Sequence, residues 1–131
     1  MSLTAKRKIY QRGLHSEKIA ALWLQLKGYK ILERRYKTRV GEIDLIARRN
    51  NMIIFVEVKA RKIREEALES ITPKMKLRIV NTARYYLAHN IADGDVQFRF
   101  DVVAIMPATL SHMKQGQFFI HHLDNAWSAT A

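Results

Sequence analysis

Residues 41–59 have the sequence GEIDLIARRNNMIIFVEVK, and this stretch decides the fold that we expect for the chain. Residues 41–48 and 53–61 have the alternating or continuously apolar patterns of strands, and Asn50-Asn51 between them favours a tight hairpin turn. A two-residue turn at this place fixes which residues face one another. On one apolar face we expect Ile43 opposite Val58, Leu45 opposite Val56 and Ala47 opposite Ile54. On the other face we expect Asp44 opposite Glu57 and Glu42 opposite Lys59.

This pairing places the carboxylates of Asp44 and Glu57 directly across the hairpin. Like charges in this position repel one another, and burial in a hydrophobic hairpin adds the cost of desolvation. Two arrangements relieve the conflict. A divalent cation binds both acids with Lys59 beside it, or Lys59 alone bridges the acids while one stays protonated. Because the ligands are hard oxygens, the expected cation is Mg²⁺ or Mn²⁺.

The rest of the chain adds helices and further strands to this hairpin. Apolar residues at helical spacing predict helices, alternation predicts strands, and Thr72-Pro73 is a typical helix start. The expected elements are a helix over 14–27, strands over 29–36, 41–48 and 53–61, a helix over 72–90, and strands over 96–106 and 117–123. The fold class is therefore a mixed α/β sheet flanked by helices, in the order α-β-β-β-α-β-β. The strand that follows the second helix should pair in parallel with one of the first three.

Length and composition indicate one globular domain. The chain has 131 residues, 48% of them hydrophobic, and no linker or repeat divides it, so we expect a single domain over 1–131. Residues 1–12 would form a basic and partly flexible arm. No apolar run approaches the roughly 18 residues of a membrane-spanning helix, and the N-terminal sequence lacks the apolar region of a signal peptide. Since there is no cysteine for disulfides or thiolate metal sites, we expect a cytoplasmic protein.

The charge of the chain favours a polyanionic partner. The 23 Lys and Arg residues exceed the 12 Asp and Glu residues, which gives a net charge of +11 and a pI near 10.2. The excess is concentrated in residues 1–40, which hold 11 basic and 2 acidic residues, a net charge of +9. A field of this size attracts nucleic acid, which we favour as the partner. An anionic membrane surface and the ribosome are the alternatives.

Two motifs in the hairpin resemble a known signature. The sequences GEIDLIAR at 41–48 and FVEVKAR at 55–61 are similar to the motif of the PD-(D/E)xK nuclease superfamily, and more closely to the YraN family of small bacterial endonuclease-like proteins. The resemblance implies a restriction endonuclease-like core and a metal-dependent nuclease that hydrolyses DNA, with branched or repair-related DNA as the expected substrate. It covers most of the chain, including Gly13, Glu17, Ala20-Ala21, Gly28-Tyr29, Thr72-Pro73 and the sequence HLDNA at 122–126.

The same resemblance implies roles for five residues. Asp44 and Glu57 would hold Mg²⁺ or Mn²⁺, helped by the backbone carbonyl of Val58. Lys59 would orient the attacking water or stabilise the charge that develops on the phosphorane. Glu17 would bind a second metal or position the first, and a surface acid in a salt bridge is its alternative. The implied chemistry is metal-assisted phosphodiester hydrolysis.

Seven basic residues are the candidates for contacts with nucleic acid, DNA rather than RNA: Arg34, Arg35, Lys37, Arg39, Arg61, Lys74 and Lys76. The chain departs from the family pattern at Met75, where a lysine is expected after Thr72-Pro73. Two other functions stay open: a non-catalytic nucleic-acid-binding module on the same fold, and a basic structural protein associated with the ribosome. Similarity to small resolvases leaves a homodimer open as well.

Overall fold

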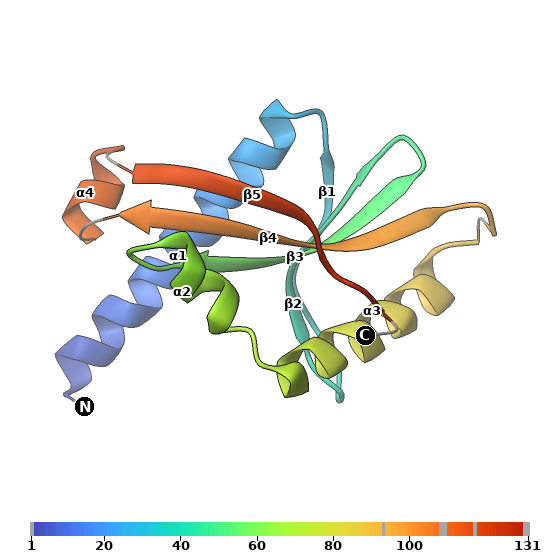
Figure 1. The fold of residues 1–131 in the computed structure, drawn as a ribbon, viewed down its shortest axis with the longest axis horizontal. Coiled ribbons are helices and arrows are strands. Elements are labelled where there is room, and N and C mark those ends of the chain that lie inside the picture. Colours follow the sequence, from blue (N-terminus) through green and yellow to red (C-terminus); the bar gives the residue numbers. More distant parts are fainter. Residues whose placement is uncertain (1, 93, 108–109, 117, 130–131) are drawn as a thin grey trace.

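The computed structural model describes residues 2–92, 94–107, 110–116 and 118–129 as a sheet covered by helices (Figure 1). Its elements are α1 (Leu3–Leu26), β1 (Lys30–Lys37), β2 (Glu42–Arg49), β3 (Met52–Ala60), α2 (Arg64–Glu69), α3 (Pro73–Asn90), β4 (Gln97–Pro107), α4 (Leu110–Lys114) and β5 (Phe118–Trp127). The long elements follow the predicted order α-β-β-β-α-β-β, which confirms the mixed α/β class. The short helices α2 and α4 were not predicted.

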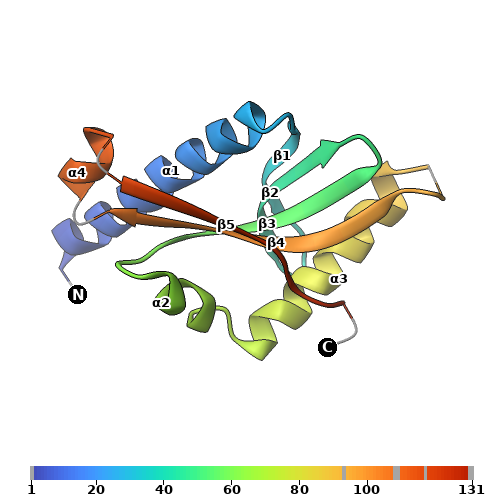
Figure 2. The same ribbon diagram turned by 45° about the horizontal axis from the view of Figure 1, so that its top comes forward.

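The five strands form one sheet in the order β1-β2-β3-β4-β5. Strands β1, β2 and β3 pair antiparallel, β3 and β4 pair in parallel, and β4 and β5 pair antiparallel. The chain between the parallel strands passes through α2 and α3, as the predicted crossover requires. Figure 2 shows α1 on one side of the sheet and α2 and α3 on the other. None of the helices in the described part of the chain combines the length and hydropathy needed to cross a membrane.

Each face of the sheet carries a hydrophobic core of its own. The α1 core comprises the buried residues Ala20, Ala21, Leu24, Tyr29, Leu45, Ala47, Ile54, Val56, Val58, Val103 and Ile105. The α3 core comprises Ile43, Ile46, Ile53, Phe55, Ile71, Ile79, Val80, Ala83, Tyr86, Phe100, Val102 and Trp127. Strands β3 and β4 supply residues to both cores, and this explains their nearly continuous apolar sequences.

The predicted hairpin register is confirmed for the part of the hairpin nearest its turn. The paired residues run from Arg49 opposite Met52 to Leu45 opposite Val56. Beyond Leu45 the ladder between β2 and β3 ends, so the direct pairs that we predicted for Glu42, Ile43 and Asp44 do not form. The prediction that Ile43 shares a face with Leu45 is also wrong. Ile43 packs in the α3 core and Leu45 in the α1 core, so the alternation of faces along β2 is interrupted between them, where the pairing with β3 ends.

Two element boundaries differ from the predictions for local reasons. Helix α1 begins at Leu3 rather than at residue 14, because the Ser2 hydroxyl accepts a hydrogen bond from the Ala5 backbone N–H (3.1 Å) and caps an earlier first turn. Strand β5 continues past Leu123 to Trp127, whose ring stacks on that of Phe100 with centroids 5.3 Å apart. Residue 117, the predicted first residue of this strand, lies outside the described residues.

Candidate functional site

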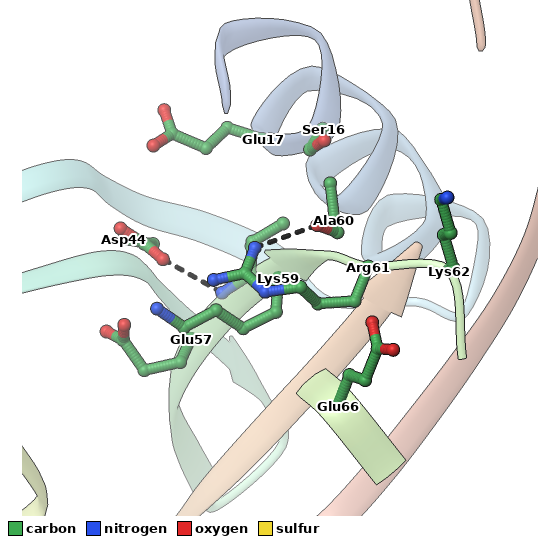
Figure 3. A pocket seen from close by; sticks show the side chains of 10 residues that line it. Ser16, Glu17, Asp44, Glu57, Lys59, Ala60, Arg61, Lys62 and Glu66 are labelled. Atoms are coloured by element: carbon green, nitrogen blue, oxygen red, sulfur yellow. Dashed lines mark hydrogen bonds between the residues drawn. The ribbon is translucent and has the colours of Figure 1, made fainter. Parts of the chain in front are cut away.

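The site begins where β2 and β3 stop pairing. Strand β2 carries Asp44 just outside the last paired residue, and its carboxylate oxygen Oδ2 accepts a hydrogen bond from the backbone N–H of Val58 (2.8 Å). A side chain of β2 therefore takes the place of a backbone acceptor. Glu57 precedes Val58 on β3 and presents its carboxylate at the same opening between the strands (Figure 3). The two acids are thus on adjacent antiparallel strands, although they are not directly paired.

Two cavities meet at these carboxylates. The larger has a volume of about 740 Å³ and is lined from α1, β2, the end of β3 and α2. The smaller has a volume of about 240 Å³ and lies on the α3 side, with Met75 and Arg78 in its lining. Asp44 and Glu57 line both cavities, so they form the wall between them. A ligand can therefore approach the carboxylates from either side of the sheet.

Glu57 is a buried acid with an oxygen that lacks a partner. The residue is 6% exposed, and its Oε1 atom has no hydrogen-bond partner among the residues that the structure describes. Burial raises the pKa of Glu57 well above its ordinary value, and the neighbouring Asp44 charge raises it further, while Lys59 opposes both effects. Such a group favours a bound proton or a bound cation.

Asp44 responds to the same environment. Burial raises its pKa from 3.8 to about 6, against the stabilising hydrogen bond from Val58. The charge of Glu17 also raises this pKa, and Lys59 lowers it. Two acids whose pKa values rise together carry less than their full negative charge at neutral pH. A divalent cation between them would restore the ionised form of both.

The structure brings the predicted catalytic residues to one cavity. Glu17, Asp44, Glu57, Val58 and Lys59 all line the larger cavity. Figure 3 shows the Lys59 ammonium between the Asp44 and Glu57 carboxylates, in agreement with its effect on the pKa of each. The sequence alternation that placed Glu57 and Lys59 on one side of β3 was thus sufficient to identify this part of the site.

Glu17 is close to the acid pair but is held by another residue. Its carboxylate accepts a hydrogen bond from Arg35 Nε at 2.7 Å, in a half-buried ion pair. Arg35, one of the residues predicted to contact nucleic acid, thus contacts α1 through its guanidinium. Its backbone has a φ of 52°, in the left-handed region that residues with a Cβ rarely adopt. Within the described residues, no three His, Cys, Asp or Glu side chains are gathered closely enough to hold a metal ion.

The other basic candidates are distributed over several surfaces. Arg34, Lys37 and Arg39 are exposed on β1 and the turn that follows it. Arg61 lies in the larger cavity, where its Nη1 donates a hydrogen bond to the Ala60 carbonyl (2.8 Å). At the start of α3, Lys74 is exposed. Lys76 lies half-buried with its ammonium 5.9 Å from the centre of the Trp127 ring.

Arg78 belongs to the site and was missed in the sequence. It lines the smaller cavity with Asp44, Glu57 and Met75. Met75 therefore does reach the site, at the position where we expected a lysine, and Arg78 supplies a cation from the next turn of α3. Its helical spacing could have identified it in the sequence: Arg78 follows Lys74 by four residues and Met75 by three, so the three side chains lie close together on α3.

Comparison with known proteins shows to which family the chain belongs. The sequence model described as "Uncharacterised protein family UPF0102" matches residues 16–105, which include every predicted catalytic residue. A UPF0102 protein of Bartonella bacilliformis is 45% identical over 117 residues, 89% of this chain and 95% of the relative. A UPF0102 protein of Mesorhizobium japonicum is 48% identical over 103 residues, 79% of this chain and 82% of the relative. One of Brucella canis is 45% identical over 102 residues, 78% of this chain and 81% of the relative. The chain therefore belongs to the UPF0102 family, also called the YraN family.

Proposed function

We propose that this protein is a nucleic-acid-binding, metal-dependent endonuclease that hydrolyses phosphodiesters at Asp44 and Glu57. The observation that carries the proposal is the pair of carboxylates, Glu57 buried and Asp44 half-buried, at the opening between β2 and β3. Both have pKa values raised by burial, and Glu57 Oε1 has no hydrogen-bond partner among the described residues. In a structural ion-pair cluster, a buried carboxylate oxygen would be expected to have a partner.

The residues present suit a hard divalent cation. The carboxylates of Asp44 and Glu57 would hold Mg²⁺ or Mn²⁺, with the backbone carbonyl of Val58 as a further oxygen ligand. When bound, the cation would polarise the phosphate and lower the pKa of a coordinated water. The unpartnered Oε1 atom of Glu57 supports this assignment, because the cation would satisfy it.

The basic residues around the carboxylates would hold the substrate. Lys59 carries a positive charge beside the acid pair, where it would stabilise the negative charge that develops on the phosphate during attack. Arg61 lines the larger cavity and Arg78 the smaller, so each would contact a phosphate on its own side of the scissile bond. The net charge of +11 would draw nucleic acid toward the site.

Cleavage and metal binding test this proposal together. The protein is incubated with branched, nicked and linear DNA and with RNA, in Mg²⁺ or Mn²⁺, beside Asp44→Ala, Lys59→Ala and Glu69→Ala. Glu69 is an exposed acid of α2 outside both cavities, and it serves as the matched control. Mn²⁺ binding is measured in parallel by calorimetry. Cleavage that Asp44→Ala and Lys59→Ala abolish and Glu69→Ala retains supports the proposal. Cleavage that survives in all variants indicates a contaminating nuclease.

A non-catalytic binding module is the second candidate. It is favoured by the Arg35–Glu17 ion pair, which holds the third acid apart from Asp44 and Glu57. If the protein is a binding module, the Asp44→Ala variant should still bind nucleic acid. The parent should show no heat of Mn²⁺ binding and should cut none of the substrates. Mn²⁺ binding that depends on Asp44 would argue against it.

A further inference from the structure

We propose that the outer face of α3 holds a single-stranded segment of nucleic acid that leads away from the carboxylates. The inference rests on the proposed function and deepens it, because it names the form of substrate that the site takes. Four of the exposed residues on this face form a strip that we call the α3 track: Lys74, Arg78, Tyr85 and His89.

The α3 track is one continuous strip. At 3.6 residues per turn, its four residues lie within about 60° of one another around the helix axis. Helix α3 has the sequence PKMKLRIVNTARYYLAHN and contains no Asp or Glu. The strip therefore combines positive charge in its first half with aromatic rings in its second. This combination of basic and aromatic side chains is typical of surfaces that bind single strands.

One residue of the α3 track, Arg78, lies at the carboxylates. Arg78 lines the smaller cavity together with Asp44 and Glu57. The turn before β2 fixes its position, because a Cβ on Gly41 would lie 3.2 Å from both the Cβ and the backbone oxygen of Arg78. Tyr85 follows Arg78 by seven residues, a helical rise of roughly 10 Å. This length is about three times the roughly 3.4 Å rise per nucleotide along one strand of a helix.

The aromatic end of the track is a preformed stack. The rings of Tyr85 and His89 have centroids 3.9 Å apart and planes inclined by 24°. A hydrogen bond of 2.8 Å between His89 Nδ1 and the Tyr85 carbonyl holds the imidazole in place. Tyr85 nevertheless remains 48% exposed. A fixed and exposed ring pair can stack with a nucleobase at little conformational cost, a contact worth about 1–3 kcal/mol per base.

Burial of the carboxylates favours a single strand over a duplex. Glu57 is 6% exposed and lies in the wall between two cavities, so a phosphate must enter a recess to reach it. A single strand bends readily and has unstacked bases to offer to Tyr85. A duplex keeps its bases inside the stack and presents only its backbone. The Tyr85–His89 stack would then have no base to contact.

Binding without metal tests the inference. Fluorescence anisotropy in EDTA compares a labelled oligothymidylate with a blunt duplex of the same length, for the parent, Tyr85→Ala, Tyr85→Phe and Phe119→Ala. Phe119 is an exposed ring at the start of β5. Helix α4, which precedes that strand, lies far from α3 in both ribbon views. We expect Tyr85→Ala to weaken single-strand binding by about 5- to 150-fold, the loss of one stacked base. We expect Tyr85→Phe, Phe119→Ala and all duplex affinities to stay within about twofold of the parent.

Arg78→Ala tests the basic end of the track in the same assay. Removal of one phosphate contact should reduce the slope of log affinity against log salt for the single strand by about 0.7. Lys114→Ala on α4 is the matched control and should leave the slope unchanged, because α4 lies far from α3.

The results separate this inference from the proposed function. Equal affinity for duplex and single strand, or no effect of Tyr85→Ala, overturns the α3 track and leaves metal-dependent cleavage standing. Tight single-strand binding that needs Tyr85, in a protein that binds no Mn²⁺ and cuts nothing, supports the track and overturns the endonuclease. Absence of binding to any nucleic acid overturns both. Melting curves check that each variant is folded. We expect the Tyr85 variants to fold, because the Tyr85 side chain is exposed.

Discussion

The carboxylate of Asp44 accepts a hydrogen bond from the backbone N–H of Val58 at the point where β2 and β3 separate. Asp44 therefore has two roles in the fold. Its oxygen satisfies a backbone donor that would otherwise lose its partner in the sheet, and its charge faces Glu57 across the opening. The first role stabilises the protein, and the second, the repulsion between two carboxylates, destabilises it.

A pair of substitutions separates these two roles. Asp44→Asn can keep an oxygen for the Val58 N–H and removes the charge, whereas Asp44→Ala removes both. We expect Asp44→Ala to be less stable than Asp44→Asn by about 1–3 kcal/mol, the cost of a buried donor without a partner. Urea denaturation at pH 8 without metal measures the difference. Equal stability of the two variants would show that the hydrogen bond contributes nothing.

Stability without metal should fall as the pH rises. Burial raises the pKa of Asp44 from 3.8 to about 6 and raises that of Glu57 well above its ordinary value. The folded protein therefore binds more protons than the unfolded chain above pH 4, and its free energy of unfolding decreases through pH 6 and beyond. The loss for Asp44 is on the order of 1–3 kcal/mol between pH 4 and pH 8.

Denaturation of the parent and of Glu57→Gln at pH 5 and at pH 8 tests this dependence. Glu57→Gln removes one of the two charges, so its stability should fall less between these pH values. Mn²⁺ at pH 8 should restore the stability of the parent and leave Glu57→Gln nearly unchanged. An increase in the parent's stability with pH would contradict the assigned direction.

The left-handed backbone of Arg35 predicts an unusual order of stability. Its φ of 52° costs a residue with a Cβ about 1 kcal/mol, and glycine avoids this cost. Arg35→Gly and Arg35→Ala both remove the ion pair with Glu17. We therefore expect Arg35→Gly to be the more stable of the two by about 1 kcal/mol, measured by chemical denaturation. The usual order, with alanine more stable, would show that the chain relaxes to another conformation at this position.

Gly41 should tolerate no side chain. A Cβ at this position would lie 2.9 Å from Thr82 Oγ1 and 3.2 Å from the backbone oxygen of Arg78. Gly41→Ala must therefore move α3 away from the start of β2, at a cost of about 1–3 kcal/mol. The matched control is Gly94→Ala, where nothing lies within 4 Å of the added Cβ. Thermal melting should show a lower Tm for the first variant only.

Asp101 should be essential for the attachment of β5. It is fully buried and accepts hydrogen bonds from Arg99 Nε (2.9 Å), His122 Nε2 (2.7 Å) and the Asn125 backbone N–H (3.0 Å). Burial alone would raise its pKa, but these hydrogen bonds outweigh burial and lower it. Its stabilising effect is therefore present above pH 4 and is lost as the pH falls below it. Asp101→Ala removes the carboxylate partner of the half-buried Arg99, which keeps its hydrogen bond to the Tyr29 hydroxyl, and should cost about 3–5 kcal/mol.

Urea denaturation at pH 7 and at pH 3 measures this loss. Asp101→Asn keeps the volume and one carbonyl oxygen, so it should lie between the parent and Asp101→Ala. The difference between Asp101→Ala and the parent should be smaller at pH 3, because the unfolded chain's carboxyl, with its ordinary pKa, is then largely protonated, and this protonation favours the unfolded chain. A pH-independent difference would show that the charge of Asp101 contributes nothing.

The sequence by itself determined the central hairpin, the order of the long elements and the identity of the acid pair. Alternation along a strand has a period of two, so the apolar residues and the Asn50-Asn51 turn sufficed to fix the register from Arg49 to Leu45. The start of α3 was equally local, because the Thr72 hydroxyl accepts its capping hydrogen bond from Met75, three residues away (3.2 Å). These features depend on interactions between residues that are close in the sequence.

Only the tertiary structure decided which distant residues complete the site. Arg35 contacts Glu17, a residue of the larger cavity, across 18 positions of the chain. Outside the site, His122 contacts Asp101 across 21 positions in the same way. Arg78 reaches the acid pair because Gly41 allows the turn before β2 to pack closely on α3. Such contacts depend on how the helices pack on the sheet, and this packing cannot be predicted from a local pattern of residues. The end of the pairing between β2 and β3 at Leu45 was likewise not predictable from the local pattern. Asp44 and Glu57 line the two cavities at this place.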